Sequence, residues 1–201
     1  MNQDRYSPLE GCQGRNPRPH CRQFAVAMIK DLLRKWSFRK SASKEPTGLL
    51  PLKEVQSAVA FISVEEQDFE ACKNDILAFY RTHGIKGSVF FFDFRKIEKG
   101  ERLITSIATT VLRKDLNWYG RPSQEKTRIM LEGEPDLFIS LLPVNSYPLE
   151  YMARCSRARF KVGRRQLDGN VFDLVVMDPV DKTLSQKDAF GEIVKLLETV
   201  K

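Results

Sequence analysis

The stretch EPDLFISLLPVNSYPLEYMARCSRARFKVGRRQLDGNVFDLVVMDPV, residues 134–180, decides the fold of this chain. Two apolar runs, 137–142 and 172–177, enclose a helical pattern at 147–157 and a short predicted strand at 159–163. A near-continuous apolar run bounded by turn residues is typical of a strand buried on both faces, as in a parallel sheet covered by helices. The order strand, helix, strand, strand therefore predicts the centre of a layered α/β domain.

The rest of the chain continues this alternation of strands and helices. Strands are expected at 58–64 and 88–94, and helices at 68–82, 123–131 and 185–200. Residues 103–112 fit both a helix and a strand, and the β-branched residues of their second half favour a strand. The alternation predicts a three-layer, Rossmann-like α/β domain with a mostly parallel sheet. Only residues 164–171 separate the last two strands, too few for a helical crossover, so one of these strands is expected to be antiparallel or at an edge.

The positive charge of the chain is concentrated near its start. The net charge is +7, and residues 1–53 hold 11 Lys and Arg against 4 Asp and Glu, whereas residues 54–201 hold 22 of each. We therefore expect a basic N-terminal arm with one amphipathic helix and a linker at 1–49, and a single α/β domain at 50–201. A basic arm can attract nucleic acid or anionic lipid, and a solvated tail is the simpler interpretation.

The arm contains one helical pattern, at 24–36. Its apolar side chains recur at helical spacing, at Phe24, Met28, Leu32 and Trp36. We expect this helix to lie against the domain or a partner, with a basic amphipathic helix on a membrane surface as the alternative. Residues 1–20 show no apolar periodicity, so residues 1–27 are expected to be an extension upstream of the true start that adds nothing to the core.

The sequence lacks the motifs of several common enzyme classes. No G-x-G-x-x-G follows a predicted strand, and neither the Walker A sequence nor G-x-S-x-G occurs, which argues against dinucleotide oxidoreductases, P-loop NTPases and α/β-hydrolases. The four cysteines form no C-x-x-C pair, so we expect no metal and no cofactor. Neither of the two histidines follows a predicted strand, so we assign no catalytic residue and do not favour an enzyme. No apolar run is long enough to span a bilayer, and a cytoplasmic location is expected.

Polar and aromatic side chains near the ends of the predicted strands are candidates for a ligand site, because open α/β sheets bind ligands there. The ligand-binding candidates are Glu65, Asp93, Asn145, Ser146, Asp178, Asp181, Trp118 and Tyr119. Free amides after Asn145 and Ser146 could hold an anion at a helix start, with ordinary capping as the preferred interpretation. The carboxylates could act as acid and base or bind Mg²⁺, with a polar strand rim preferred. The two aromatic residues form either a binding platform or, as we prefer, a cap over the core.

A group of basic residues without any acid lies at 154–165. Its members are Arg154, Arg157, Arg159, Lys161, Arg164 and Arg165. Such a group could bind an anion or the phosphates of a nucleic acid. Cations are also favourable at the end of a helix, so a solvated helix end and loop is the preferred interpretation.

Three segments carry a resemblance to a known family. They are DLNWYGRP at 115–122, DLFI at 136–139 and SRARFKVG at 156–163. Through them the chain resembles, from about residue 50 to its end, a family of small bacterial proteins of unknown function. The resemblance implies a single α/β domain with no established activity.

More remotely, residues 136–163 are similar to a segment in the N-terminal half of lipopolysaccharide heptosyltransferases. In those proteins a buried strand, a polar turn and a helix are followed by a short stretch in which a small residue, a basic residue, Val or Ile, and Gly come in that order. The chain departs from that pattern at Ser140, which stands where an acid is expected, and at Glu65 and Glu66, which replace a Gly-Asp turn. The sugar-nucleotide-binding half is missing, so the similarity implies a shared Rossmann-like architecture without glycosyl transfer.

These observations favour a non-enzymatic α/β binding or interaction module with an unknown protein or small-molecule partner. The alternative is a small ligand-binding protein or enzyme that acts on sugar- or phosphate-bearing substrates at the strand-end cleft. A second alternative, not favoured, is a protein that associates with nucleic acid through the basic arm.

Overall fold

A computed structural model describes residues 19–96, 104–179 and 181–200, with the backbone alone for 19–25. Six strands form one sheet in the order β3-β2-β1-β4-β5-β6. The strands are β1 (Ser57–Ser63), β2 (Lys86–Asp93), β3 (Thr110–Leu112), β4 (Leu137–Ser140), β5 (Phe160–Gly163) and β6 (Leu174–Val175). Every neighbouring pair of strands is parallel, so the predicted mostly parallel sheet is parallel throughout.

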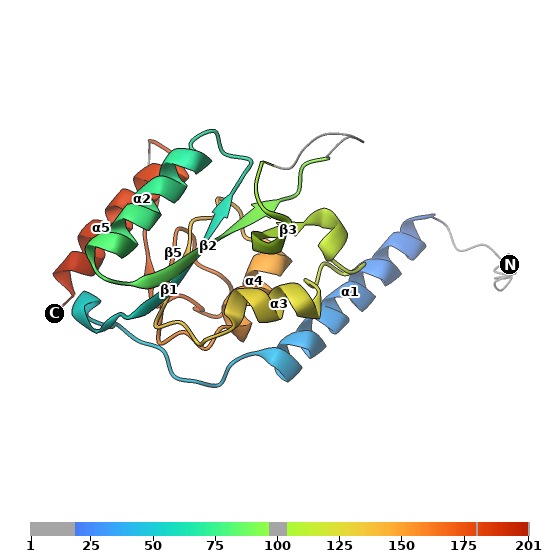
Figure 1. Ribbon diagram of the computed structural model, residues 1–201. Coiled ribbons are helices and arrows are strands. Elements are labelled where there is room, and N and C mark those ends of the chain that lie inside the picture. Colours follow the sequence, from blue (N-terminus) through green and yellow to red (C-terminus); the bar gives the residue numbers. More distant parts are fainter. Residues whose placement is uncertain (1–18, 97–103, 180, 201) are drawn as a thin grey trace, which may run out of the picture.

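Helices cover both faces of the sheet, which confirms the layered α/β architecture (Figure 1). On one face lie α2 (Phe69–Thr82) and α5 (Gln186–Thr199). The other face is covered by α3 (Gln124–Leu131) and α4 (Tyr147–Cys155). The long helix α1 (Pro19–Ser41) packs on the outside of α4, and its N-terminal end extends past the rest of the molecule (Figure 1).

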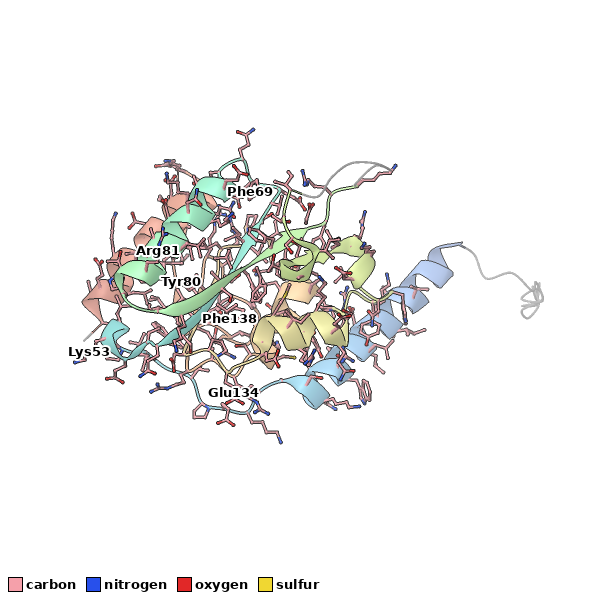
Figure 2. The ribbon with its side chains drawn as sticks, in the orientation of Figure 1. Lys53, Phe69, Tyr80, Arg81, Glu134 and Phe138 are labelled. Atoms are coloured by element: carbon pink, nitrogen blue, oxygen red, sulfur yellow. The ribbon has the colours of Figure 1, made fainter. Side chains whose placement is uncertain are left out.

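The central strands divide the core into two layers because successive side chains point to opposite faces. In β1, Ala60 and Ile62 join the layer beneath α2 and α5, whereas Phe61 joins the layer beneath α3 and α4. The ring of Phe61 meets that of Phe138 of β4 edge to face, with centroids 4.9 Å apart. Phe138 is fully buried, and Figure 2 shows its label near the centre of the molecule. A strand buried on both faces explains the continuous apolar run of the sequence.

The end of α2 follows its local sequence. Gly84 has a φ of +67°, a left-handed conformation that favours glycine and stops the helix. The Nδ1 atom of His83 lies 3.0 Å from the carbonyl oxygen of Phe79, and its ring packs on Phe79. His83 therefore serves the helix end.

The last two strands are parallel neighbours although no helix lies between them. The sequence predicted that one of these two strands is either antiparallel or at an edge. β6 is parallel and lies at the edge of the sheet, so the second possibility is confirmed. The return is tight at Gly163, where a Cβ atom would meet the Phe172 ring at 2.5 Å. The ambiguous segment 103–112 contains the 3-10 turn η2 (Ile107–Thr109) and then β3, so its second half is a strand as expected.

Short turns and a docked linker complete the fold. The remaining 3-10 turns are η1 (Leu52–Glu54) and η3 (Arg113–Asp115). Two hydrogen bonds hold the segment between α1 and η1. The amide of Ser43 donates to the carbonyl of Arg154 at 2.7 Å, and the amide of Gly48 donates to the carbonyl of Arg159 at 3.0 Å. The linker therefore follows the surface of the domain, while residues 1–18 of the predicted arm lie outside the described residues.

Candidate functional site

In open α/β sheets a crevice lies at the switch point, where the chain leaves one strand toward one face of the sheet and the neighbouring strand toward the other. In this sheet the two strands are β1 and β4. Ligands of open α/β sheets bind at such a switch point, beyond the carboxyl ends of the strands. Here the position is occupied by Arg164, which follows β5 and has only 2% of its side chain exposed. One NH1 hydrogen bond goes to Glu66 Oε1 at 2.7 Å and another to the carbonyl of Leu141 at 3.4 Å. NH2 donates to the carbonyl of Leu184.

Gln186 at the start of α5 completes this network. Its amide donates to Glu66 Oε2 at 2.9 Å, and its side chain exchanges two hydrogen bonds of 3.1 Å with the backbone of Ser63. A buried charge is tolerated when it is paired and hydrogen-bonded. Glu66, Arg164 and Gln186, which we call the crevice network, therefore join the ends of β1 and β5 to α5 and fill the crevice. No local pattern identifies Gln186, because its partners are 120 or more positions away.

The predicted carboxylates at the strand ends are also engaged within the chain. Asp93 is 1% exposed and accepts from Arg95 Nε at 2.9 Å and NH2 at 2.8 Å. These bonds lower the pKa of the Asp93 carboxyl, against burial, which acts to raise it. Glu65 accepts from the amide of Phe94 at 3.1 Å. Among the residues that the structure describes, no three His, Cys, Asp or Glu side chains gather as metal ligands.

The remaining strand-end acids belong to the rim of the sheet. Asp178 pairs with Arg165 NH2 at 2.6 Å and accepts from the amide of Leu184 at 3.1 Å. Asp181 lies on the surface. Asp178 thus stabilises the loop before α5.

A second hollow, of about 490 Å³, lies between α1 and the start of α4. It brings together three residues predicted from the sequence, Asn145, Ser146 and Arg154. Asn145 Nδ2 donates to the carbonyl of Gln166 at 2.7 Å, and the Ser146 side chain makes no capping bond to α4. The volume falls within the range of small-molecule sites. Neither Asp178 nor Trp118 lines this hollow, which we call the α1–α4 cleft.

The charges of the α1–α4 cleft largely satisfy one another. Arg34 Nε donates to the carbonyl of Tyr119 at 2.9 Å, and the guanidinium lies 4.7 Å from the Tyr147 ring centroid. Arg154 Nε pairs with Glu150 at 2.8 Å. Three carboxylates line the cleft beside three cations, so it offers little net attraction to an anion.

The loop with two aromatic residues presents them differently. Tyr119 packs on the core and lies 6.3 Å from Tyr147, ring to ring, so the cap interpretation holds for it. Trp118 is 58% exposed, and the cap interpretation is wrong for it. Asn117 Oδ1 accepts from the amides of Tyr119 and Arg121, which fixes the turn. The two rings meet edge to face in this turn, with centroids 5.6 Å apart.

The six basic residues of 154–165 do not form one patch. Arg157 and Arg159 pair with Glu134 at 2.5 Å and Asp136 at 3.3 Å, before the start of β4, and Figure 2 shows Glu134 at the periphery. Lys161 is buried, its Nζ donates to a carbonyl of α4 at 2.9 Å, and burial lowers its pKa. Of the other three, Arg154 lines the α1–α4 cleft, Arg164 belongs to the crevice network, and Arg165 pairs with Asp178. These contacts are those of ordinary ion pairs and hydrogen bonds within the chain and not of a surface that binds the phosphates of a nucleic acid.

Helix α1 turns several of its apolar side chains away from the domain. The exposed fractions are 70% for Met28, 53% for Ile29, 72% for Leu32 and 55% for Trp36. The opposite face packs on α4 through Ser37, which is buried, and Phe38, whose ring lies 5.2 Å from that of Tyr147. Of the helices in the described parts of the chain, α1 included, none has the length and apolarity to cross a membrane.

The fold and the filled crevice define a single-domain α/β protein of the Rossmann-like type. The chain belongs to a family of unknown function (DUF6913), whose model matches residues 30–199. The predicted resemblance to a family of unknown function is confirmed, and the match begins inside α1. No curated protein and no solved structure matches the chain.

Proposed function

We propose that this protein is a non-enzymatic binding or interaction module that acts in the cytoplasm. One observation carries the proposal: the crevice in which α/β folds bind ligands holds the crevice network instead. A ligand that entered there would have to displace the pair of Arg164 and Glu66, which are 2.7 Å apart. A buried charge left without its partner costs about 3–5 kcal/mol, which such a ligand would have to offset. We therefore expect a partner to bind to the outer surface of the domain and not in the crevice.

A thermal-shift screen of the full chain against nucleotides, nucleotide sugars and sugar phosphates tests this proposal. We expect no compound to raise the melting temperature. A ligand present at 100 times its Kd would add about 2.7 kcal/mol, which corresponds to roughly 5–10 °C for a domain of this size. A shift of that size with one compound would contradict the proposal.

A small-molecule binder or enzyme is the second candidate, and the α1–α4 cleft favours it. The cleft has a suitable volume and contains Asn145 and Ser146 beside the start of α4. In the same screen, this candidate predicts a shift that Asn145→Ala abolishes and that Asn74→Ala, an exposed Asn on α2, leaves intact. A shift that survives Asn145→Ala would contradict it.

A further inference from the structure

The outward face of α1 is an apolar stripe with no partner among the described residues. Its members are Met28, Ile29, Leu32 and Trp36, each more than half exposed. Residues three and four apart in a helix share one side, so these side chains form a continuous surface over adjacent turns. Single exposed apolar residues are ordinary, whereas a contiguous group rimmed by polar residues marks an interaction site.

Cations accompany this stripe. Arg39 and Lys40 follow Trp36 by three and four residues, so they extend the same side by one turn. Lys40 Nζ lies 5.3 Å from the centre of the Trp36 ring. Residues 26–41 hold five cations and one acid, and that acid, Asp31, lies 3.8 Å from Arg34 on the helix itself. The surface is therefore both apolar and positively charged.

We propose that the outward face of α1 docks the protein on the surface of an anionic membrane. The apolar side chains would enter the boundary between headgroups and acyl chains, while Lys and Arg contact the anionic headgroups. Trp36 suits this depth, since indole combines an apolar ring with a polar N–H group. This inference rests on the proposed function and names the partner of the module.

The charge and the geometry select a membrane over other occupants. A second copy of the chain would bring the same cations face to face. A nucleic acid would neutralise the cations but would leave Met28, Leu32 and Trp36 without an apolar environment. The face points away from α4, and α1 lies at the outside of the molecule, so it can lie flat on a surface without rearrangement of the domain (Figure 1).

Co-sedimentation of the full chain with vesicles tests the inference. With about 30% phosphatidylglycerol in phosphatidylcholine we expect binding at least tenfold tighter than with phosphatidylcholine alone, because each cation near an anionic surface strengthens binding roughly fivefold. Raising the salt to about 0.5 M should weaken binding, because screening shortens the reach of the charges. Equal binding to both vesicles, or none to either, would overturn the inference.

Fluorescence then locates the contact. The protein has two tryptophans, so Trp118→Phe leaves Trp36 as the sole indole. We expect its emission to shift to the blue with anionic vesicles and to be quenched by brominated acyl chains. Unchanged emission while the protein sediments would place the contact elsewhere and overturn the assignment to α1.

Surface variants separate a specific face from general stickiness. The double variant Leu32→Ser and Trp36→Ser should lose at least tenfold in vesicle affinity, and Arg39→Gln with Lys40→Gln should lose a similar factor. The control, Leu196→Ser with Lys195→Gln on α5, removes one exposed apolar residue and one cation from another helix and should retain full binding. Unchanged melting temperatures show that each variant is folded.

Other outcomes assign the face differently. Self-association that Leu32→Ser abolishes, without a preference for anionic lipid, would assign the face to a second copy and overturn the membrane proposal. Binding to RNA that Arg39→Gln abolishes while Leu32→Ser has no effect would overturn it in favour of nucleic acid. A failure on vesicles leaves the filled crevice untouched, whereas a ligand found by thermal shift would contradict the proposed function and leave vesicle binding intact.

Discussion

At the scale of single residues, Arg164 is the charge on which the strand ends depend. Its side chain is 2% exposed, and its Nε has no hydrogen-bond partner among the described residues, so Glu66 and two carbonyl groups must offset its burial. Arg165, the next residue, forms a pair of 2.6 Å with Asp178 and keeps 43% of its side chain exposed. The two neighbours therefore offer a matched comparison of a buried and a surface ion pair.

We expect Glu66→Ala to destabilise the protein by about 3–5 kcal/mol, because it leaves Arg164 buried without its anion. Arg165→Ala, which removes the exposed partner of Asp178 and leaves the bond from the Leu184 amide in place, should cost about 1 kcal/mol or less. Urea unfolding of both variants measures the difference. A loss of about 1 kcal/mol or less for Glu66→Ala would show that the crevice network is dispensable.

Asp93 should make stability depend on pH. Its folded pKa is held below the usual value by hydrogen bonds from Arg95, so the unfolded chain takes up a proton first as the pH falls. The contribution is fully present above the unfolded pKa of about 3.9 and is lost as the pH falls through the lower folded pKa. The difference in unfolding free energy between wild type and Asp93→Asn should therefore be constant near neutral pH and shrink below about pH 4. A difference that stays constant to pH 2 would contradict the pairing.

At the scale of elements, two glycines respond in opposite ways to one added methyl group. Gly163 ends β5 against the Phe172 ring, which a Cβ atom would meet at 2.5 Å, whereas Gly191 lies in α5 with nothing within 4 Å. Gly163→Ala should cost about 1–3 kcal/mol through overpacking. Gly191→Ala should add about 0.5–1 kcal/mol, because alanine is the better helix former. Thermal or urea unfolding measures both, and a neutral Gly163→Ala would show that the return to β6 is loose.

Much of the fold could be predicted from local pattern, and the crevice could not. The runs at 137–142 and 88–94 contain β4 and most of β2, because their apolar residues are buried on both sides of the sheet. The network of Glu66, Arg164 and Gln186 joins residues far apart in sequence, and only the folded sheet brings them together. Helix α1 shows the limit in another way, since its apolar spacing predicted a helix but not that this face would point outward.

At the scale of the whole molecule, we expect the boundary between dispensable and stabilising residues of the N-terminal arm to lie within α1. A chain of residues 28–201 should keep its stability within about 1 kcal/mol, because Val26, the one sizeable apolar residue described before Met28, is 46% exposed. Removing 1–41 also removes Phe38 from Tyr147 and Tyr151 and should cost at least about 3 kcal/mol. Urea unfolding of both truncations locates the boundary, and a changed denaturant slope for 28–201 would place the arm in the core.

The central claim is that the protein binds with the outside of α1 and not with its strand-end crevice. Hydrogen exchange of the full chain, with and without anionic vesicles, tests it most directly, because amide protection reports local opening and covering along the chain. We predict that vesicles slow exchange in residues 26–41 and leave the loops at 64–68 and 164–167 unchanged. Protection of those loops with no change in α1 would contradict the account.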